Sequence, residues 1–258
     1  MCGIIGIVGN DAAAPRLMDG LRRLEYRGYD SAGICTLVDG ALERRRAEGK
    51  LDNLQRELDK APLPGTIGIA HTRWATHGAP TVGNAHPHVV DGVAVVHNGI
   101  IENFKALREE MQAKGRSFSS ETDSEVVAHL VADQLAAGKD PEAAVAAVLP
   151  RLHGAFALAI LFRDHPGMIV GARVGAPLTV GYGAGENYLG SDAIALAALI
   201  AIPSAAIPFV GTKTLVLAAG ALITLALFIV ARLARGNIIF PPFLLVGALW
   251  LPSLAYAL

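Results

Sequence analysis

Acidic residues are confined to the first three quarters of this 258-residue chain. All 23 Asp and Glu residues, and all eight His residues, lie at or before Asp192. Up to that point 19 basic residues stand against the 23 acidic ones, so the formal net charge is −4. The 66 residues from Ala193 to Leu258 carry no acid and only three basic residues. We therefore predict a folded domain over residues 1–196 and a chemically different, apolar tail over residues 197–258.

The tail contains three uncharged segments that we compare with the length of a membrane span. They cover residues 193–210, 215–231 and 238–258. A spanning helix needs about 20 predominantly apolar residues, so two or three transmembrane helices are expected. Arg232 and Arg235 should then face the cytoplasm, and three crossings would place the first domain there too, attached to the inner membrane. The alternative is a buried helical hairpin in a soluble domain.

The second residue is a candidate nucleophile. If Met1 is removed, Cys2 carries both a thiol and a free α-amine, whose ordinary pKa of about 7.7–8.0 suits it to take the thiol proton. The run CGIIGIVGN reads as a buried strand that ends in a turn, so Cys2 would begin a core strand. The other cysteine, Cys35, fits a small buried apolar residue. Two cysteines and no signal-like leader predict a reducing cytoplasm.

The first part alternates short β-branched runs with helical stretches. The grouping of the strands, without regular β-α-β alternation, predicts an α+β fold of antiparallel sheets covered by helices. Strands are expected at 3–8, 31–38, 66–71, 93–97, 155–162, 168–173 and 188–191. Helices are expected at 12–24, 51–60, 101–114, 123–137 and 141–152. The balance of charge over this part argues against a nucleic acid as partner.

A polar constellation runs through HTRWATHG, NAHPH, VHNGIIEN and SETDSE. Arg73 could hold an α-carboxylate, Asp123 an α-ammonium, and Asn98 with Gly99 the charge on an attacked carbonyl. Each has a simpler interpretation: Asn-Gly after a strand is typical of a hairpin turn, and Asp123 could cap the next helix. The His residues between 71 and 97 could be core histidines or a metal site, although their spacing matches no standard zinc pattern.

Together with CGIIGIVG and LRRLEYRGYDSAG, these motifs resemble the N-terminal glutaminase domain of the glutamine:fructose-6-phosphate aminotransferase (glucosamine-6-phosphate synthase) family. These are class II glutamine amidotransferases. The resemblance runs from Met1 to about Leu196. It implies an Ntn-hydrolase fold, a four-layer αββα sandwich of two antiparallel sheets between helices, and a reaction in which L-glutamine yields L-glutamate and ammonia through a γ-glutamyl thioester.

The resemblance also assigns roles to individual residues. Cys2 would attack the carboxamide, and the oxyanion hole would come from Asn98 and Gly99. The residues implied in substrate binding are Arg73 with Thr76 and His77 for the α-carboxylate, Asp123 for the α-ammonium, Trp74 for closing the site, His86 in support, and Arg27 with Tyr29 over the nucleophile. No cofactor or metal is expected.

From Ala197 the chain departs from that family. The family continues into two sugar-isomerase domains, and no phosphosugar site is expected here, because GYGAGENYLG runs between strand-like segments and reads as a turn. Complete synthase activity is therefore not expected of this chain alone, which could be a fused or truncated gene product. Partners could be a separate synthase subunit or a second copy of the chain. The other functions left open are a non-catalytic, membrane-tethered glutamine-binding or interaction domain, and a metal-binding module.

Overall fold

The computed structural model describes residues 2–197, 199, 215–218 and 229–230. The twelve strands among these residues form two six-stranded sheets, in which strands distant in sequence lie side by side. The first sheet has the order β3-β2-β4-β1-β10-β9, with the strands β1 (Gly3–Val8), β2 (Ser31–Val38), β3 (Ala41–Glu48), β4 (Ile67–Arg73), β9 (Thr179–Gly183) and β10 (Glu186–Gly190). The second has the order β12-β11-β8-β7-β6-β5, with the strands β5 (His88–Val90), β6 (Val93–Gly99), β7 (Phe156–Phe162), β8 (Ile169–Val174), β11 (Leu215–Ala218) and β12 (Ile229–Val230).

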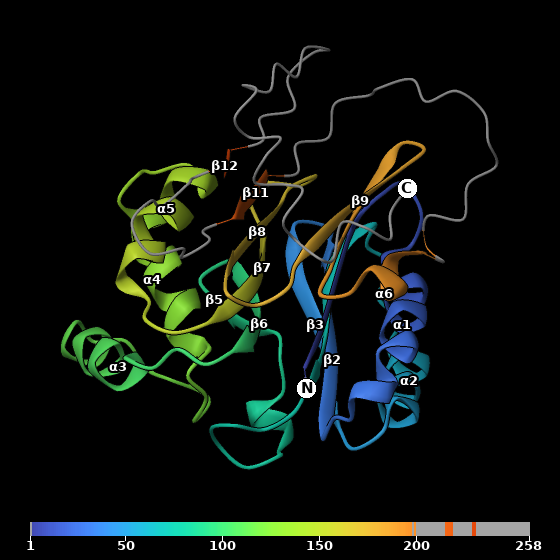
Figure 1. The fold of residues 1–258 in the computed structure, drawn as a ribbon, viewed down its shortest axis with the longest axis horizontal. Coiled ribbons are helices and arrows are strands. Elements are labelled where there is room, and N and C mark those ends of the chain that lie inside the picture. Colours follow the sequence, from blue (N-terminus) through green and yellow to red (C-terminus); the bar gives the residue numbers. More distant parts are fainter. Residues whose placement is uncertain (1, 198, 200–214, 219–228, 231–258) are drawn as a thin grey trace.

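Helices cover the outer face of each sheet, so the two sheets lie between two helical layers (Figure 1). The first sheet carries α1 (Ala13–Arg23), α2 (Leu51–Lys60) and α6 (Ala193–Ala197). The second carries α3 (Phe104–Ala113), α4 (Glu125–Ala136) and α5 (Pro141–Val148). Short 3₁₀ turns occupy Glu25–Arg27, Val82–Asn84 and Leu149–Arg151. The α+β class and the pair of antiparallel sheets expected from the sequence are confirmed, with the parallel pairing of β11 to β8 as an exception.

The central apolar layer fixes which side chains face one another across the two sheets. Side chains alternate between the two faces of a strand. On β4, Ile67 and Ile69 point into the layer between the sheets, and on β6 Ala94 and Val96 do so. By the same alternation His71 on β4 and Asn98 on β6 point toward the opposite sheet. Two polar side chains therefore meet where the apolar layer ends.

Several strands carry no simple apolar signal. The sequence ALERRRAE forms β3, whose Arg44 and Arg46 reach across to carbonyls of the 83–87 segment. The segment β5 is only three residues long, and β9 is rich in glycine. We predicted neither these three strands nor the short helix α6. The GYGAGENYLG segment forms the β9–β10 hairpin, with Gly185 at a φ of +76° in its turn, in agreement with the predicted turn.

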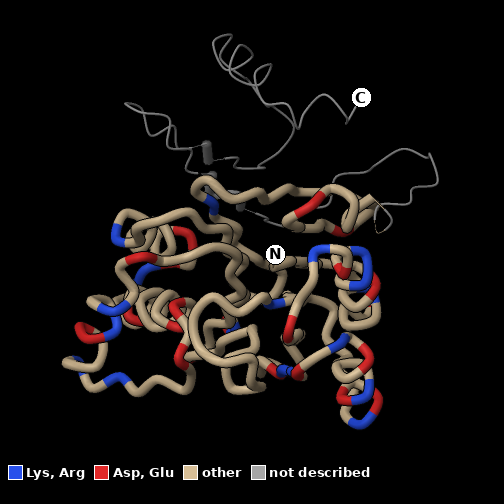
Figure 2. Tube along the Cα trace, turned by 60° about the horizontal axis from the view of Figure 1, so that its bottom comes forward, with Lys and Arg blue, Asp and Glu red and all other residues tan. Residues whose placement is uncertain are grey.

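Charged residues lie mostly on the outer helices and loops, and apart from the edge strand β3 the strands between them are largely uncharged (Figure 2). Among the described residues, no helix is both long enough and apolar enough to cross a membrane. Within the segment 215–231, where we expected a spanning helix, the described residues form β11 and β12. The rest of that segment, and most of the other two candidate spans, lie outside the described residues.

Candidate functional site

The thiol of Cys2 lies immediately before β1, at the edge of the first sheet. The main-chain N–H of Trp74 donates to its Sγ over 3.2 Å, and the thiol faces the Trp74 carbonyl at 3.6 Å. Burial raises the pKa of Cys2, and the hydrogen bond from Trp74 only partly offsets that effect. A thiol held neutral in this way needs a base before it can act as a nucleophile. Met1 lies outside the described residues.

The main-chain carbonyl of Cys2 accepts hydrogen bonds from two of the candidate residues. Arg27 donates through Nη1 over 3.2 Å, and Asn98 donates through Nδ2 over 3.3 Å. Arg27 also forms an ion pair of 2.6 Å with Asp192, just after β10. The Glu25–Arg27 turn, strand β6 and the segment after β10 are thereby held around Cys2.

Gly99 ends β6 in a conformation that excludes other residues. Its φ is +117°, and a Cβ there would lie 2.1 Å from the carbonyl oxygen of Ala155. Asn98 and Gly99 pair with Ala157 and Phe156 in the β6–β7 ladder, so they do not form the hairpin turn that was the alternative. The amide of Asn98 reaches both Cys2 and His71, since its Oδ1 lies 3.0 Å from His71 Nε2.

Arg73 is nearly fully buried at the end of β4 and organises the loop that follows. Its guanidinium donates to the carbonyls of Ala79 at 3.1 Å and Gly78 at 3.0 Å, and also to that of His77. A guanidinium has five N–H donors, so these bonds do not exhaust it. Thr76 is exposed on this loop. The His77 ring packs edge-on against the Phe104 ring, with 4.9 Å between the ring centroids.

Trp74 opens the same loop and packs over the turn that carries Arg27. A Cβ placed on Gly28 would lie 2.8 Å from the Trp74 ring, so the ring rests directly on that glycine. The indole is nevertheless 54 % exposed. A large apolar side chain that covers a backbone turn and leaves half its surface in solvent is suited to closing over a bound molecule.

Asp123 is buried just before α4, and its carboxylate accepts the N–H of Ile101 over 2.9 Å. It does not cap α4, because that helix begins at Glu125 with Ser124 at the N-cap position. Ser124 instead donates to Asp123 over 3.3 Å and lies 2.8 Å from His97 Nδ1. The Asp123 carboxylate is therefore held beside Ile101, two residues after the end of β6 at Gly99.

His86 lies in a cluster of buried histidine rings. Its ring centroid is 4.2 Å from that of His71 and 4.7 Å from that of His88. Burial lowers the pKa of His71 and of His88 to about 3 and that of His86 well below its usual value, so all three rings are neutral near pH 7. Among the described residues no group of three or more His, Cys, Asp or Glu side chains is arranged to hold a metal ion.

Tyr29 bonds to the start of α2 and to the turn before it. Its hydroxyl accepts the N–H of Leu51 over 2.9 Å at the start of α2 and donates to Glu25, and burial raises its pKa to about 12. Its contacts tie the Glu25–Arg27 turn to α2. The described contacts thus bring Cys2, Arg27, Trp74 and Asn98 together, and they link Arg73 and Asp123 to adjoining segments.

Three residues outside the sequence-based set also support this site. Asp30 accepts the N–H of Ala75 and lies 3.8 Å from the Arg73 guanidinium, Asp192 holds Arg27, and His71 contacts Asn98. Asp30 stands in the EYRGYD motif and His71 opens HTRWATHG, so the motifs included them, but nothing in the spacing showed which side chain each one contacts.

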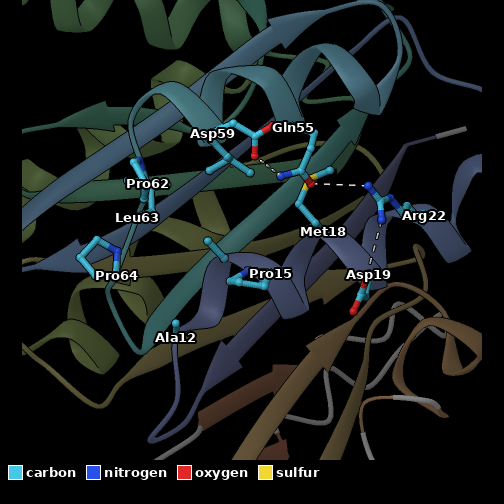
Figure 3. A pocket seen from close by; sticks show the side chains of 12 residues that line it. Ala12, Pro15, Met18, Asp19, Arg22, Gln55, Asp59, Pro62, Leu63 and Pro64 are labelled. Carbon is cyan, nitrogen blue, oxygen red and sulfur yellow. Dashed lines mark hydrogen bonds and ion pairs between the residues drawn. The ribbon is translucent and has the colours of Figure 1, made fainter.

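A surface pocket of about 640 Å³ lies elsewhere, between α1 and α2 (Figure 3). Its lining includes Pro15, Met18 and Leu63, with Arg22, Gln55 and Asp59 at the rim. None of the candidate site residues lines it. Around Cys2 the structure places the Asn98 amide, next to Gly99, and the main-chain N–H of Trp74, while the buried charged side chains Arg73 and Asp123 lie on adjoining segments.

The chain is similar to known proteins over its first three quarters. Residues 71–198 match the family described as "Glutamine amidotransferase domain". Over 199 residues the chain is 70 % identical to the glutamine–fructose-6-phosphate aminotransferase [isomerizing] of Zymomonas mobilis, and over 198 residues 64 % identical to that of Gluconobacter oxydans. These alignments cover 77 % and 76 % of this chain, but each covers only 33 % of the relative, so the chain spans about a third of their length.

A solved structure of similar fold is the glutamine phosphoribosylpyrophosphate amidotransferase from B. subtilis. It is 26 % identical with a TM-score of 0.67, and the match covers 76 % of this chain and 43 % of that one. A glutamine aminotransferase class-II domain protein from Silicibacter pomeroyi shares the fold at 17 % identity, with a TM-score of 0.52 over 73 % of this chain and 88 % of that one.

Proposed function

We propose that the part of this chain that matches glutamine amidotransferases hydrolyses L-glutamine to L-glutamate and ammonia, with Cys2 as the nucleophile. The observation that carries the proposal is the convergence on Cys2 of an amide donor from β6 and a main-chain donor from the Trp74 loop. A thiol and a donor pair for a developing negative charge are the two requirements for attack on a carboxamide.

The reaction begins with proton transfer from the Cys2 thiol. Because burial raises the pKa of this thiol, a nearby base is required, and removal of Met1 would supply one as the α-amine of Cys2 itself. The thiolate sulfur then bonds to the side-chain carbonyl carbon of glutamine, and the C=O electron pair moves onto oxygen. The second N–H of the Asn98 amide and the N–H of Gly99 would stabilise that oxyanion.

Collapse of the tetrahedral intermediate breaks the C–N bond. The protonated α-amine returns its proton to the leaving nitrogen, which departs as ammonia, and a γ-glutamyl thioester remains on Cys2. Water then attacks the thioester carbonyl, loses a proton to the α-amine, and releases L-glutamate with the regenerated thiol. The exposed Trp74 ring, resting on Gly28, would cover the bound substrate and keep the thioester from solvent until ammonia has left.

Recognition of the zwitterionic substrate would use two side chains of opposite charge. Arg73 would bind the α-carboxylate, with Thr76 and His77 on the same loop, and Asp123 would bind the α-ammonium. The burial of Arg73 and Asp123 supports this assignment, because a charge pair in a water-poor site interacts more strongly than one in solvent. His86 would support the site by packing against His71 in the histidine cluster.

The acceptor of the ammonia follows from the relatives. Those of 64–70 % identity carry the name glutamine–fructose-6-phosphate aminotransferase, which supports a sugar phosphate as the acceptor and a synthase part as the partner that binds it. Since this chain spans about a third of those proteins, the acceptor would bind to a domain or subunit beyond the residues matched here.

The decisive assay measures glutamate and ammonia formed from L-glutamine by the purified chain and by Cys2→Ala. Cys35→Ala is the matched control, because Cys35 is the other cysteine and is buried between the sheets. We expect turnover in the parent and in Cys35→Ala and none above background in Cys2→Ala. Glutamine binding without turnover in the parent would favour the non-catalytic binding domain.

We further propose that the apolar residues of the tail outside β11 and β12 attach the chain to the inner membrane, with the catalytic domain in the cytoplasm. The support is the composition of residues 193–258, which carry no acid and three basic residues. Cell fractionation compares the full chain with a version ending at Ala197. We expect the full chain in the membrane pellet and the shorter one in the supernatant; a soluble full chain would contradict the attachment.

A further inference from the structure

One buried histidine next to the proposed oxyanion hole has no role in the reaction described above. His71 is fully buried on β4 and points across the apolar layer toward β6. Its Nε2 lies 3.0 Å from Oδ1 of Asn98, and the other end of the same amide donates to the Cys2 carbonyl over 3.3 Å. The Asn98 amide on the second sheet therefore links His71 on the first sheet to the main chain of Cys2, the residue that carries the nucleophile.

The chemistry of the groups fixes the direction of both hydrogen bonds. A main-chain carbonyl can only accept, so the group of Asn98 that faces Cys2 is the NH₂, and Oδ1 faces His71. An amide oxygen can also only accept, so Nε2 of His71 carries a proton. Burial lowers the pKa of His71 to about 3, so its ring is neutral near pH 7 and Nε2 holds the only ring proton.

We propose that His71 is a positioning residue that fixes the orientation of the Asn98 amide, so that Nδ2 rather than Oδ1 faces the reacting carbonyl. An amide rotated by half a turn would place an acceptor where the oxyanion needs a donor, and would change stabilisation into repulsion. The shape of the amide does not distinguish the two orientations, because its O and N ends have nearly the same size, so the choice depends on hydrogen bonds. The Cys2 carbonyl favours the same orientation from the NH₂ end, and His71 fixes it from the oxygen end.

Packing around His71 holds the ring in the plane that this role requires. The His86 ring lies against it at 4.2 Å with an interplanar angle of 38°, and His86 is packed in turn by His88 at 4.7 Å. The N–H of His97, one residue before Asn98, donates to His86 Nδ1 over 3.4 Å. The histidine cluster that orients His71 is therefore hydrogen-bonded to the strand that carries Asn98. This inference rests on the proposed hydrolysis of glutamine.

The test is a double-mutant cycle on glutamine hydrolysis by the full chain. His71→Leu removes the donor, and we expect kcat to fall about 10- to 100-fold with KM within about twofold, because the amide is misoriented only in its transition-state contact. In an Asn98→Ala background, the same substitution should lower kcat by no more than about twofold, since His71 would act through Asn98. His71→Gln retains an N–H donor near the Nε2 position and should recover kcat to within a few fold of the parent.

Leu54→Ala, a buried core substitution on α2, controls for loss of stability. We expect it to lower the unfolding midpoint with little change in kcat. An equal loss of kcat from His71→Leu in both backgrounds would show a purely structural role and overturn the inference, as would an unchanged kcat in the parent background. If the parent does not hydrolyse glutamine at all, the proposed function has failed instead.

A second measurement tests the geometry without activity. Nitrogen-15 NMR of histidine-labelled protein reports which ring nitrogen of His71 carries the proton. We expect the Nε2–H tautomer, with a proton resonance that shifts in Asn98→Ala and not in Leu54→Ala. An Nδ1–H tautomer would reverse the hydrogen bond to Asn98 and overturn the inference whatever the kinetics.

Discussion

The side-chain amide of Asn98 donates to the main-chain carbonyl of Cys2 over 3.3 Å, so the proposed oxyanion donor is fixed directly to the residue that carries the nucleophile. The two residues are 96 positions apart in sequence and lie on different sheets. A donor attached in this way needs little reorganisation when negative charge develops nearby, which is the condition under which such donors lower an activation barrier most.

Replacing Asn98 by Ala tests this directly. We expect kcat for glutamine hydrolysis to fall about 10²- to 10³-fold, because one oxyanion donor is lost, while the KM for glutamine changes little. Steady-state kinetics with glutamate detection measure both constants. Asn103→Ala, at the start of α3, is the matched control, since its amide bonds to the 151–153 segment and not to Cys2. Unchanged kcat in Asn98→Ala would remove this residue from the role.

Arg73→Lys should weaken glutamine binding by about 10-fold or more. A lysine ammonium is a point charge and cannot form the two parallel hydrogen bonds that a guanidinium makes with a carboxylate. It would also lose contacts with the carbonyls of Gly78 and Ala79, which order the loop after β4. Calorimetric titration of glutamine onto Cys2→Ala protein measures affinity without turnover. Arg151→Lys, a partly exposed pair with Glu110, should bind like the parent, and equal affinity for Arg73→Lys would refute the carboxylate assignment.

Asp123→Asn should reduce glutamine affinity by about 10-fold while leaving the fold intact. An asparagine oxygen can still accept the N–H of Ile101, so the local hydrogen bond persists and only the negative charge is lost. The same titration measures the effect. Asp140→Asn makes the same charge change at the N-cap of α5, where both residue types cap well, and should bind glutamine normally. A normal affinity in Asp123→Asn would place the α-ammonium elsewhere.

The apolar strands could be predicted because burial on both faces leaves an uninterrupted apolar run. The sequences FALAILF in β7 and GIIGIV in β1 are such runs, and both strands were expected. By contrast, β3 is an edge strand whose arginines form hydrogen bonds to a neighbouring loop, so its sequence shows neither alternation nor an apolar run. It forms by pairing along its whole length with β2 across the tight turn at Asp39 and Gly40, and that turn, rather than any apolar run, is its signal in the sequence.

The site residues that could be named from their motifs were those whose residue type determines their chemistry. Cys2, Arg73 and Asp123 were chosen in this way, and where each lies is fixed by the strands and loops that carry it. The direction in which a side chain points could not be predicted from its residue type. Tyr29 stands beside Gly28 in the same motif as Arg27, yet its hydroxyl points to the start of α2. The contact of His71 with Asn98 also depends on the facing of two sheets, which only the folded chain establishes.

The buried histidines make stability sensitive to acid. The pKa values of His71 and His88 are lowered to about 3 in the folded chain, from an ordinary value of 6.5, so between these limits the unfolded chain binds more protons. The free energy of unfolding should therefore fall as pH is lowered below about 6.5, by about 1.4 kcal/mol per pH unit for each such histidine. Urea unfolding between pH 5 and 7 measures this slope above the range where carboxylates with lowered pKa values, such as Glu186, contribute.

His71→Gln provides the comparison for that slope. Glutamine does not titrate, so the variant should show a slope smaller by about 1.4 kcal/mol per pH unit near pH 5.5. Leu54→Ala, which removes no titratable group, should keep the parent slope. Identical slopes in the parent and in His71→Gln would show that His71 is protonated in the folded chain, against the neutral ring described above.

The central claim is that Cys2 at a free N-terminus forms a thioester with glutamine, and intact-mass spectrometry of acid-quenched protein tests it most directly. We expect the purified parent chain to lack the mass of Met1 and, after brief mixing with L-glutamine, to gain the mass of one γ-glutamyl group. Peptide mapping should place that group on Cys2, and Cys2→Ala should gain nothing. An active chain that retains Met1, or a glutamyl adduct on any residue other than Cys2, would contradict the claim.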